Sequence, residues 1–217
     1  MSTYKIDGQG KTLKEAMTNK YVIEDFQREY TWESKHIEQM LFDLDFAFHI
    51  SYEEGNDVEN VKTYKPYFMG PYIISETGDK DKSLIDGQQR LTSFTLLLLY
   101  LLRNYPDLKD DLKDMICRKY FAKYSYNLQV ESRRPVMDYL FNGDPIGDKK
   151  LDISCQNMLE RYNDIEEMYP ERLKANTKAH MFAWWLMEKV MMVEVSSTSK
   201  DDAYTIFETM NDRAIVR

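Results

Sequence analysis

The stretch that decides the fold is Ser83-Leu84-Ile85-Asp86-Gly87-Gln88-Gln89-Arg90-Leu91-Thr92-Ser93-Phe94, and an apolar run from Leu96 to Leu102 follows it. The apolar residues 84–85 indicate the end of a strand. Asp86-Gly87 is typical of a turn, and Asp86 is also a good helix N-cap. The residues after the turn favour a helix that is apolar nearly all round, which predicts the buried central helix of a domain. Arg90 and Arg103 bound it, so the segment is too short for a membrane span, which needs about 20 apolar residues.

The first turn of this predicted helix is polar. Gly87, Gln88, Gln89 and Arg90 place backbone N–H groups, two amides and a guanidinium at the positive end of the helix, where an anion such as phosphate is favoured. Asp86 adds a carboxylate that can hold a cation. The alternative is a capped helix whose polar first turn is only solvated, because helix N-termini are commonly polar.

Composition narrows the class of protein. The 217 residues are 43% hydrophobic and 13% aromatic, which is typical of a globular chain. The net charge of −8 argues against a general polyanion-binding surface but allows a small anion in a local basic pocket. Two separated cysteines fit a reducing cytoplasm, and the polar N-terminus lacks the apolar region of a signal peptide. The three scattered histidines match no zinc or catalytic-triad spacing.

The first half of the chain predicts alternating short elements. Residues 11–20 indicate a short helix with Leu13, Ala16 and Met17 inward, and 21–23 a strand. The next nine residues place aromatics around Gln27-Arg28. Either this segment is a turn at the edge of the core, or its polar side chains form a second set of hydrogen-bond donors that reaches the site at Asp86. From residue 34 the spacing predicts an amphipathic helix with a solvated Asp43 and Asp45, and its apolar positions are Ile37, Met40, Leu41, Leu44 and Phe48. Residues 67–74 predict a strand with a bulge or an edge at Gly70-Pro71.

The second half predicts mainly helices. We expect one helix over 107–120, irregular chain over 125–150, helices over 151–169 and 174–190, a strand over 190–195 and a helix over 201–210. That last helix ends in Asn211-Asp212-Arg213, a further polar motif so close to Arg217 that the chain reads as the front part of a longer protein. Residues 118–124 interleave bases with aromatics. Either they contact nucleic acid, or Lys and Arg lie over aromatic rings on a solvated face.

Four segments occur in the order of one family: Tyr21…Phe26-Gln27-Arg28-Glu29-Tyr30…Trp32, then Tyr67-Phe68-Met69-Gly70, then Ile85-Asp86-Gly87-Gln88-Gln89-Arg90-Leu91-Thr92, then Phe207-Glu208-Thr209-Met210-Asn211-Asp212-Arg213. The chain resembles, over about 21–213, the N-terminal domain of GmrSD-type proteins. These are ParB/sulfiredoxin-like modules of modification-dependent restriction and other phage-defence systems. The Asp-Gly-Gln-Gln-Arg block is the most specific of the four segments.

The resemblance implies an α+β fold, with a small mixed ParB/sulfiredoxin-like sheet, a buried central helix and a large helical region. It implies a nucleotide-binding core over 1–105, a helical region over 106–190, and a strand and helix over 191–217 that return to the core. A C-terminal HNH-type nuclease domain normally follows in this family. We expect that domain to lie outside this chain, so no nuclease activity is expected from the chain alone.

The resemblance also implies that a nucleoside triphosphate is bound and hydrolysed at the Asp-Gly-Gln-Gln-Arg block. Asp86 would hold a divalent cation, which we expect to be Mg²⁺. The expected catalytic residues are Asp86, Gln88 and Arg90. The expected nucleotide-binding residues are Gln27, Arg28, Gly87, Gln89, Thr92, Asn211, Asp212 and Arg213. The family usually has a glycine after the Asn-Asp-Arg motif, for which a positive φ is a natural reason, but this chain has Ala214.

The expected partners are a nucleoside triphosphate, modified DNA through the full-length protein, the HNH-type domain and a second copy in a homodimer. No membrane is expected. Two other classes stay open. One is a DNA-binding or nuclease ParB-like domain, against which the acidic balance counts. The other is an interaction module that keeps the fold without turnover.

Overall fold

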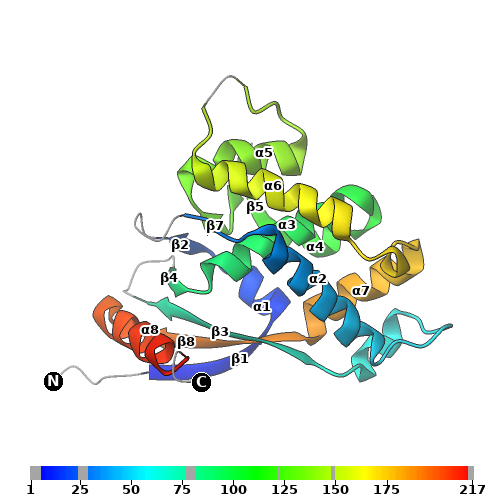
Figure 1. Cartoon of the computed structure of the whole chain (residues 1–217), viewed down its shortest axis with the longest axis horizontal. Coiled ribbons are helices and arrows are strands. Elements are labelled where there is room, and N and C mark those ends of the chain that lie inside the picture. The colour runs from blue at the N-terminus through cyan, green and yellow to red at the C-terminus, as the bar shows by residue number, and fades with distance from the viewer. Residues whose placement is uncertain (1–5, 24–28, 77–81, 122, 148–149, 215–217) are drawn as a thin grey trace.

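Six strands form the main sheet in the order β1-β8-β3-β4-β2-β7. The computed structural model describes residues 6–23, 29–76, 82–121, 123–147 and 150–214 (Figure 1). The strands are β1 (Ile6–Thr12), β2 (Tyr21–Ile23), β3 (Tyr67–Ser75), β4 (Lys82–Asp86), β7 (Leu128–Gln129) and β8 (Val190–Ser197). The pairs β1–β8 and β3–β4 are antiparallel, whereas β3–β8, β2–β4 and β2–β7 are parallel. The prediction of a mixed sheet in an α+β fold is therefore confirmed.

Strand β3 lies inside the sheet and carries a bulge. Its register against β8 shifts between Phe68 and Pro71, and Gly70 between them has a φ of +98°. Of the two alternatives for Gly70-Pro71, the bulge is correct and the edge position is wrong. The bulge makes room for the side chain of Arg90, described below.

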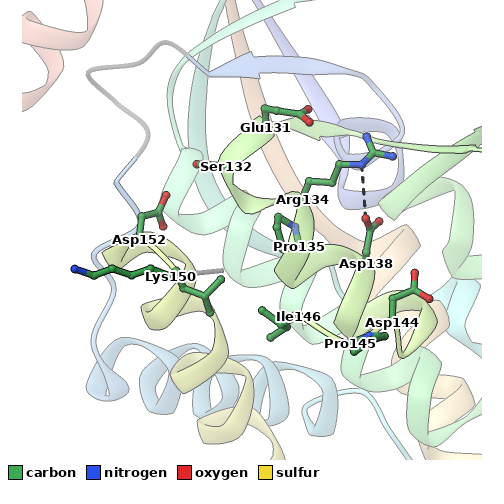
Figure 2. Close-up of a pocket in the computed structure, with 11 residues that line it drawn as sticks. Glu131, Ser132, Arg134, Pro135, Asp138, Asp144, Pro145, Ile146, Lys150 and Asp152 are labelled. Atoms are coloured by element: carbon green, nitrogen blue, oxygen red, sulfur yellow. Dashed lines mark ion pairs between the residues drawn. The ribbon is translucent and has the colours of Figure 1, made fainter. Parts of the chain in front are cut away.

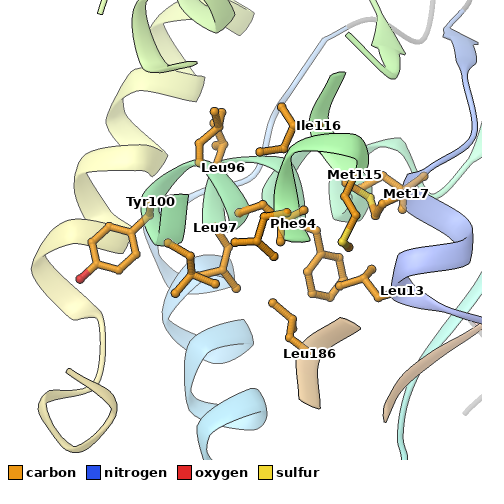
Figure 3. Close-up of a cluster of buried hydrophobic side chains, with 14 of the residues drawn as sticks. Leu13, Met17, Phe94, Leu96, Leu97, Tyr100, Met115, Ile116 and Leu186 are labelled. Carbon is orange, nitrogen blue, oxygen red and sulfur yellow. The ribbon is translucent and has the colours of Figure 1, made fainter. Parts of the chain in front are cut away.

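Helix α3 (Gln88–Asn104) is the buried centre of the molecule, as predicted. Every residue from Leu91 to Leu101 is buried. Its side chains share one core with those of α1 (Leu13–Met17), α4 (Lys109–Ile116) and α7 (Asn176–Lys189), part of which Figure 3 shows. The inward positions Leu13, Ala16 and Met17 are buried, which confirms the prediction for this short helix. Only a helix with no polar face can be surrounded in this way.

The two faces of the sheet are covered by different helices. Tyr72 and Ile74 of β3 belong to the main core with α3, whereas Ile73 belongs to a second, small cluster with Ile85 and Ala203. This alternation follows from the two-residue period of a strand. Ala203 lies on α8 (Lys200–Ala214), which covers the second face of the sheet (Figure 1). Helix α8 and the loop between β4 and α3 are thereby brought together.

The remaining predicted helices are confirmed with shifted ends. They are α2 (Ser34–His49), α6 (Ile153–Met168) and α7, and short 3-10 helices span Val58–Thr63, Pro106–Leu108, Glu131–Arg133 and Glu171–Leu173. One prediction on α2 is wrong. Asp45 is not solvated but buried, because it accepts hydrogen bonds from Arg172 at 2.6–2.9 Å and lies 3.1 Å from His49. No described helix is long and apolar enough to cross a membrane.

Two predictions for residues 107–150 are wrong. Helix α4 ends at Ile116, and β5 (Cys117–Tyr120) pairs with β6 (Lys123–Tyr126) in a separate two-stranded sheet. Tyrosine-rich segments favour strands when they find a partner. The chain predicted to be irregular holds α5 (Arg134–Asn142), which begins with Pro135 in its first turn and ends at Gly143 with a φ of +81°. Proline and glycine mark the two ends of this helix, not a loop.

Candidate functional site

A cleft of about 580 Å³ lies where the first turn of α3 meets α8. It is lined by Trp32, Ile85, Asp86, Gly87, Gln88, Gln89, Arg90, Tyr204, Phe207 and Glu208. The whole Asp-Gly-Gln-Gln-Arg block therefore lies on the wall of one cleft. The other wall comes from residues more than a hundred positions later in the chain.

Gly87 is the N-cap of α3 and can only be a glycine. Its φ is +94°, and a Cβ at this position would lie 2.7 Å from the Cβ of the buried Tyr72. Asp86 is the last residue of β4, opposite Ile73, so the expectation that Asp86 caps the helix is wrong. No described side chain caps the helix. The N–H groups of its first turn therefore keep the positive end of the dipole at the cleft.

Arg90 brings a positive charge to the cleft from the first turn of α3. Its Nη1 atom donates a 2.8 Å hydrogen bond to the carbonyl oxygen of Pro71 and lies 3.2 Å from the point where a Cβ on Gly70 would stand. Burial lowers the pKa of Arg90, and the charge of Asp86 opposes this effect. An arginine stays protonated under such conditions, so the guanidinium is a fixed cation held by the bulge in β3.

The two glutamines have different surroundings. The Gln88 amide oxygen is buried and accepts no hydrogen bond from any residue that the structure describes. Gln89 is fully engaged, because its Oε1 accepts from the Thr31 amide at 2.9 Å and its Nε2 donates to the Glu29 carbonyl at 2.7 Å. The Gln88 oxygen is thus buried without a described partner, whereas Gln89 fixes the backbone of segment 29–31.

Segment 29–32 is held to the helical layer by several bonds. The Tyr30 amide donates to Ser154 Oγ at 2.7 Å, and Asn157 donates to the Tyr30 carbonyl at 2.7 Å. Arg161 donates to the Trp32 carbonyl at 3.1 Å, and the Trp32 ring stacks on His36. These bonds place Trp32 on the rim of the cleft. Gln27 and Arg28 lie outside the described residues, directly before this anchored segment.

The Asn-Asp-Arg motif lies in the last turn of α8, which extends four residues past the predicted end of the helix at Met210. The helix continues through Ala214, so the backbone there is helical with a negative φ and needs no glycine. The side chains of Asn211, Asp212 and Arg213 are outside the description. Three earlier residues of the same helix, Tyr204, Phe207 and Glu208, line the cleft.

Comparison with known families gives one match. The model of the GmrSD restriction endonuclease N-terminal domain matches residues 11–216. The chain belongs to this family. A search of curated proteins found no match.

One residue of this GmrSD-type domain that was expected to bind nucleotide, Thr92, lies away from the cleft. Thr92 is buried, and its hydroxyl accepts a hydrogen bond from the Arg133 guanidinium at 3.1 Å. It is two residues after Arg90, the end of the polar block, but does not line the cleft. Sequence reasoning also missed Tyr204, Phe207 and Glu208 as lining residues. Their spacing of three and four along α8 was the available signal.

A second cavity of about 650 Å³ lies beside α5 and α6 (Figure 2). Several of its charged groups already have protein partners. Arg134 pairs with Asp138 at 3.6 Å, and Tyr126 donates to the same carboxylate at 2.6 Å. Asp152 accepts from the Cys155 amide at 2.7 Å as the N-cap of α6. These pairings stabilise the local fold, so we take the cleft at α3 as the candidate functional site of the GmrSD-type domain.

Proposed function

We propose that this domain binds a nucleoside triphosphate in the cleft at α3 and hydrolyses it, and thereby regulates a modification-dependent restriction endonuclease that acts on DNA. The observation that carries the proposal is the first turn of α3, an uncapped positive helix end in a cleft beside a fixed guanidinium. Helix N-termini of this kind bind phosphate through their N–H groups.

The cleft offers separate places for phosphate and base. The free N–H groups at the start of α3 would hold phosphate oxygens, and Arg90 supplies a charge clamp. The aromatic rings of Trp32, Tyr204 and Phe207 offer apolar surface for a base. The volume of about 580 Å³ lies in the usual range of small-molecule sites. The two kinds of surface together suit a nucleotide better than inorganic phosphate.

A divalent cation would bind through few protein ligands. Among the described residues no group of three or more His, Cys, Asp or Glu side chains could hold a metal ion. Mg²⁺ at nucleotide sites commonly uses one or two carboxylates and completes its shell with phosphate oxygens and water. Asp86 and Glu208, both on the cleft wall, fit that requirement. The ion would neutralise charge on the phosphates.

The remaining roles follow from the contacts. The Gln88 amide lines the cleft but has its oxygen buried, so it would have to turn toward the cleft to orient the attacking water. Arg90 would stabilise negative charge on the transferred phosphoryl group. Gln89 would act by holding segment 29–32 and not by touching phosphate. Arg28 and the Asn-Asp-Arg motif stay predicted ligands on the strength of their positions in the chain. Cytoplasmic location, a homodimer and an HNH-type partner domain also stay predictions.

The test combines binding with turnover. ATP, GTP, CTP or UTP with Mg²⁺ should raise the melting temperature, since a ligand at 100 times its Kd adds about 2.7 kcal/mol. Asp86→Asn should abolish phosphate release and leave the unliganded melting temperature nearly unchanged, because Asp86 is not the helix cap. Asp110→Asn, an exposed acid on α4, is the matched control. No shift with any nucleotide at millimolar concentration would refute binding, and full phosphate release by Asp86→Asn would refute the role of Asp86.

A further inference from the structure

The hairpin formed by β5 and β6 is a surface feature that the nucleotide cleft does not explain. Its strands pair antiparallel, with Lys119 opposite Tyr124 and Tyr120 opposite Lys123, so the tip begins at Phe121. It is the same segment whose alternation of bases and aromatics left two interpretations open. Among the described strands, β5 and β6 pair with each other in a two-stranded sheet that is separate from the main sheet.

Phe121 at the tip is exposed in full, with a relative accessibility of 101%. Its φ is +52°, the left-handed region that glycine and asparagine normally occupy in hairpin turns. A phenylalanine in this conformation is strained, and its exposed ring gains no stabilisation from packing. Neither the backbone nor the core favours this residue at this position. The hairpin presents an aromatic ring to solvent.

Basic residues are concentrated in and beside the hairpin that carries Phe121. From residue 113 to 124 the chain has four basic residues and one acidic residue, although its overall net charge is −8. The ammonium groups of Lys113 and Lys119 both lie 5.9 Å from the centre of the Tyr124 ring, and Lys123 is exposed near the tip. Arg118 donates to the Thr18 carbonyl at 2.9 Å, which fixes the base of the hairpin. The result is a local basic surface on an acidic protein.

We propose that this hairpin is a DNA-binding element, in which the lysines contact phosphates and Phe121 packs against the bases. Lysine is depleted in protein–protein interfaces, so this combination suits a polyanion better than a protein partner. β-Ribbon proteins place their strands in the major or minor groove, and minor-groove binders insert apolar side chains between base steps. The surface is separate from the nucleotide cleft and does not depend on it.

The probe is a fluorescently labelled DNA duplex of about 20 base pairs, titrated with the 217-residue chain at several salt concentrations. The double variant Lys119→Gln/Lys123→Gln should lower the slope of log K against log salt by about 1.8, since each lost phosphate contact accounts for about 0.9. Phe121→Ala should weaken binding about 5- to 150-fold with an unchanged slope, because an aromatic–base stack carries no charge.

Matched variants control for charge and hydrophobicity. Lys35→Gln/Lys65→Gln removes the same charge from exposed positions elsewhere, and Phe42→Ala removes a ring that is 62% exposed on α2. Both should leave binding as in the wild type. All variants should keep the melting temperature and the nucleotide-induced shift, which separates this proposal from the function proposed above.

Three results would overturn the proposal. The first is a wild-type chain that does not bind the duplex at 50 mM salt. The second is hairpin variants that bind like the control variants. The third is a set of hairpin variants that bind DNA like the wild type but no longer bind anionic phosphatidylserine vesicles. That result would assign the same lysines and ring to a membrane surface.

Discussion

Replacing Gly87 with alanine tests the geometry that the site depends on. Two penalties add at this position. A φ of +94° costs a residue with a Cβ about 1–2 kcal/mol. The new Cβ would also lie 2.7 Å from Tyr72 Cβ and 3.4 Å from Tyr72 Cα. Overpacking of this kind typically costs about 1–3 kcal/mol. The expected loss of unfolding free energy is therefore about 2–5 kcal/mol.

Rotation of the tyrosine ring cannot relieve the contact, because Cβ is fixed by the backbone of β3. The ring itself is also held, since Tyr72 donates a 2.7 Å hydrogen bond to Glu194 and packs edge-on against Tyr21. The strand and the start of α3 must separate instead. The variant should also lose its melting-temperature response to nucleotide, because the helix end would move from its place in the cleft.

Urea unfolding and thermal melting measure the loss, which corresponds to roughly 4–20 °C for a chain of this size. Substitutions at two other glycines separate the backbone penalty from the steric penalty. Gly143 has a φ of +81° and open space around it, so Gly143→Ala should show only the backbone penalty. Gly10 has open space and no positive φ, so Gly10→Ala should be neutral or gain about 0.4–1 kcal/mol. If Gly87→Ala lost no more than Gly143→Ala, the close approach to Tyr72 would be refuted.

Three further outcomes follow from single contacts. Gln89→Ala should lower the free energy of unfolding by about 1–3 kcal/mol and speed hydrogen exchange at the Thr31 amide, because both side-chain hydrogen bonds to segment 29–31 are lost. Unchanged exchange would contradict this. Burial raises the pKa of Cys117 and Cys155 to about 12, so at pH 8 only about one thiol in 10⁴ is ionised and neither should react with a thiol reagent before unfolding. Burial alone would raise the pKa of Asp152, but bonds from Cys155 and Ser132 and the charge of Arg133 hold it below its usual value. Because the native pKa is lowered, the Asp152 carboxylate stabilises the fold above about pH 4, and this stabilisation is lost on acidification. Asp152→Asn keeps a capping side chain, so the free energy of unfolding should fall less steeply below pH 4 in this variant. A fall as steep as in the wild type would refute this role.

Elements with strong local patterns could be predicted from the sequence. Helix α3 was predictable because an unbroken apolar run after a turn can only be buried, and α2 because its apolar residues repeat at three and four. Strands β2, β3 and β8 were predicted within about two residues of their ends. Residues 86–90 could also be predicted to lie together, because they are contiguous across the end of β4 and the first turn of α3, and all five line one cleft.

Short segments with mixed patterns could not be predicted. Residues 117–120 became a strand because 123–126 was there to pair with them, and a four-residue segment carries too little pattern to decide this alone. Asp86 looked like a helix cap, but pairing with Ile73 extends β4 through it and passes the cap to Gly87. Asp45 looked solvated because its partner Arg172 lies more than a hundred residues away.

The sequence by itself determined the buried helix, its polar first turn and the turn at Asp86-Gly87 that precedes it. The tertiary structure decided what faces that turn. Strand β8 inserts beside β3, and this pairing carries α8 onto the second face of the sheet, so that Tyr204, Phe207 and Glu208 close the cleft. Local pattern reports which side of an element is buried, whereas the identity of its neighbour depends on contacts between distant segments, which the period of a helix or strand does not encode.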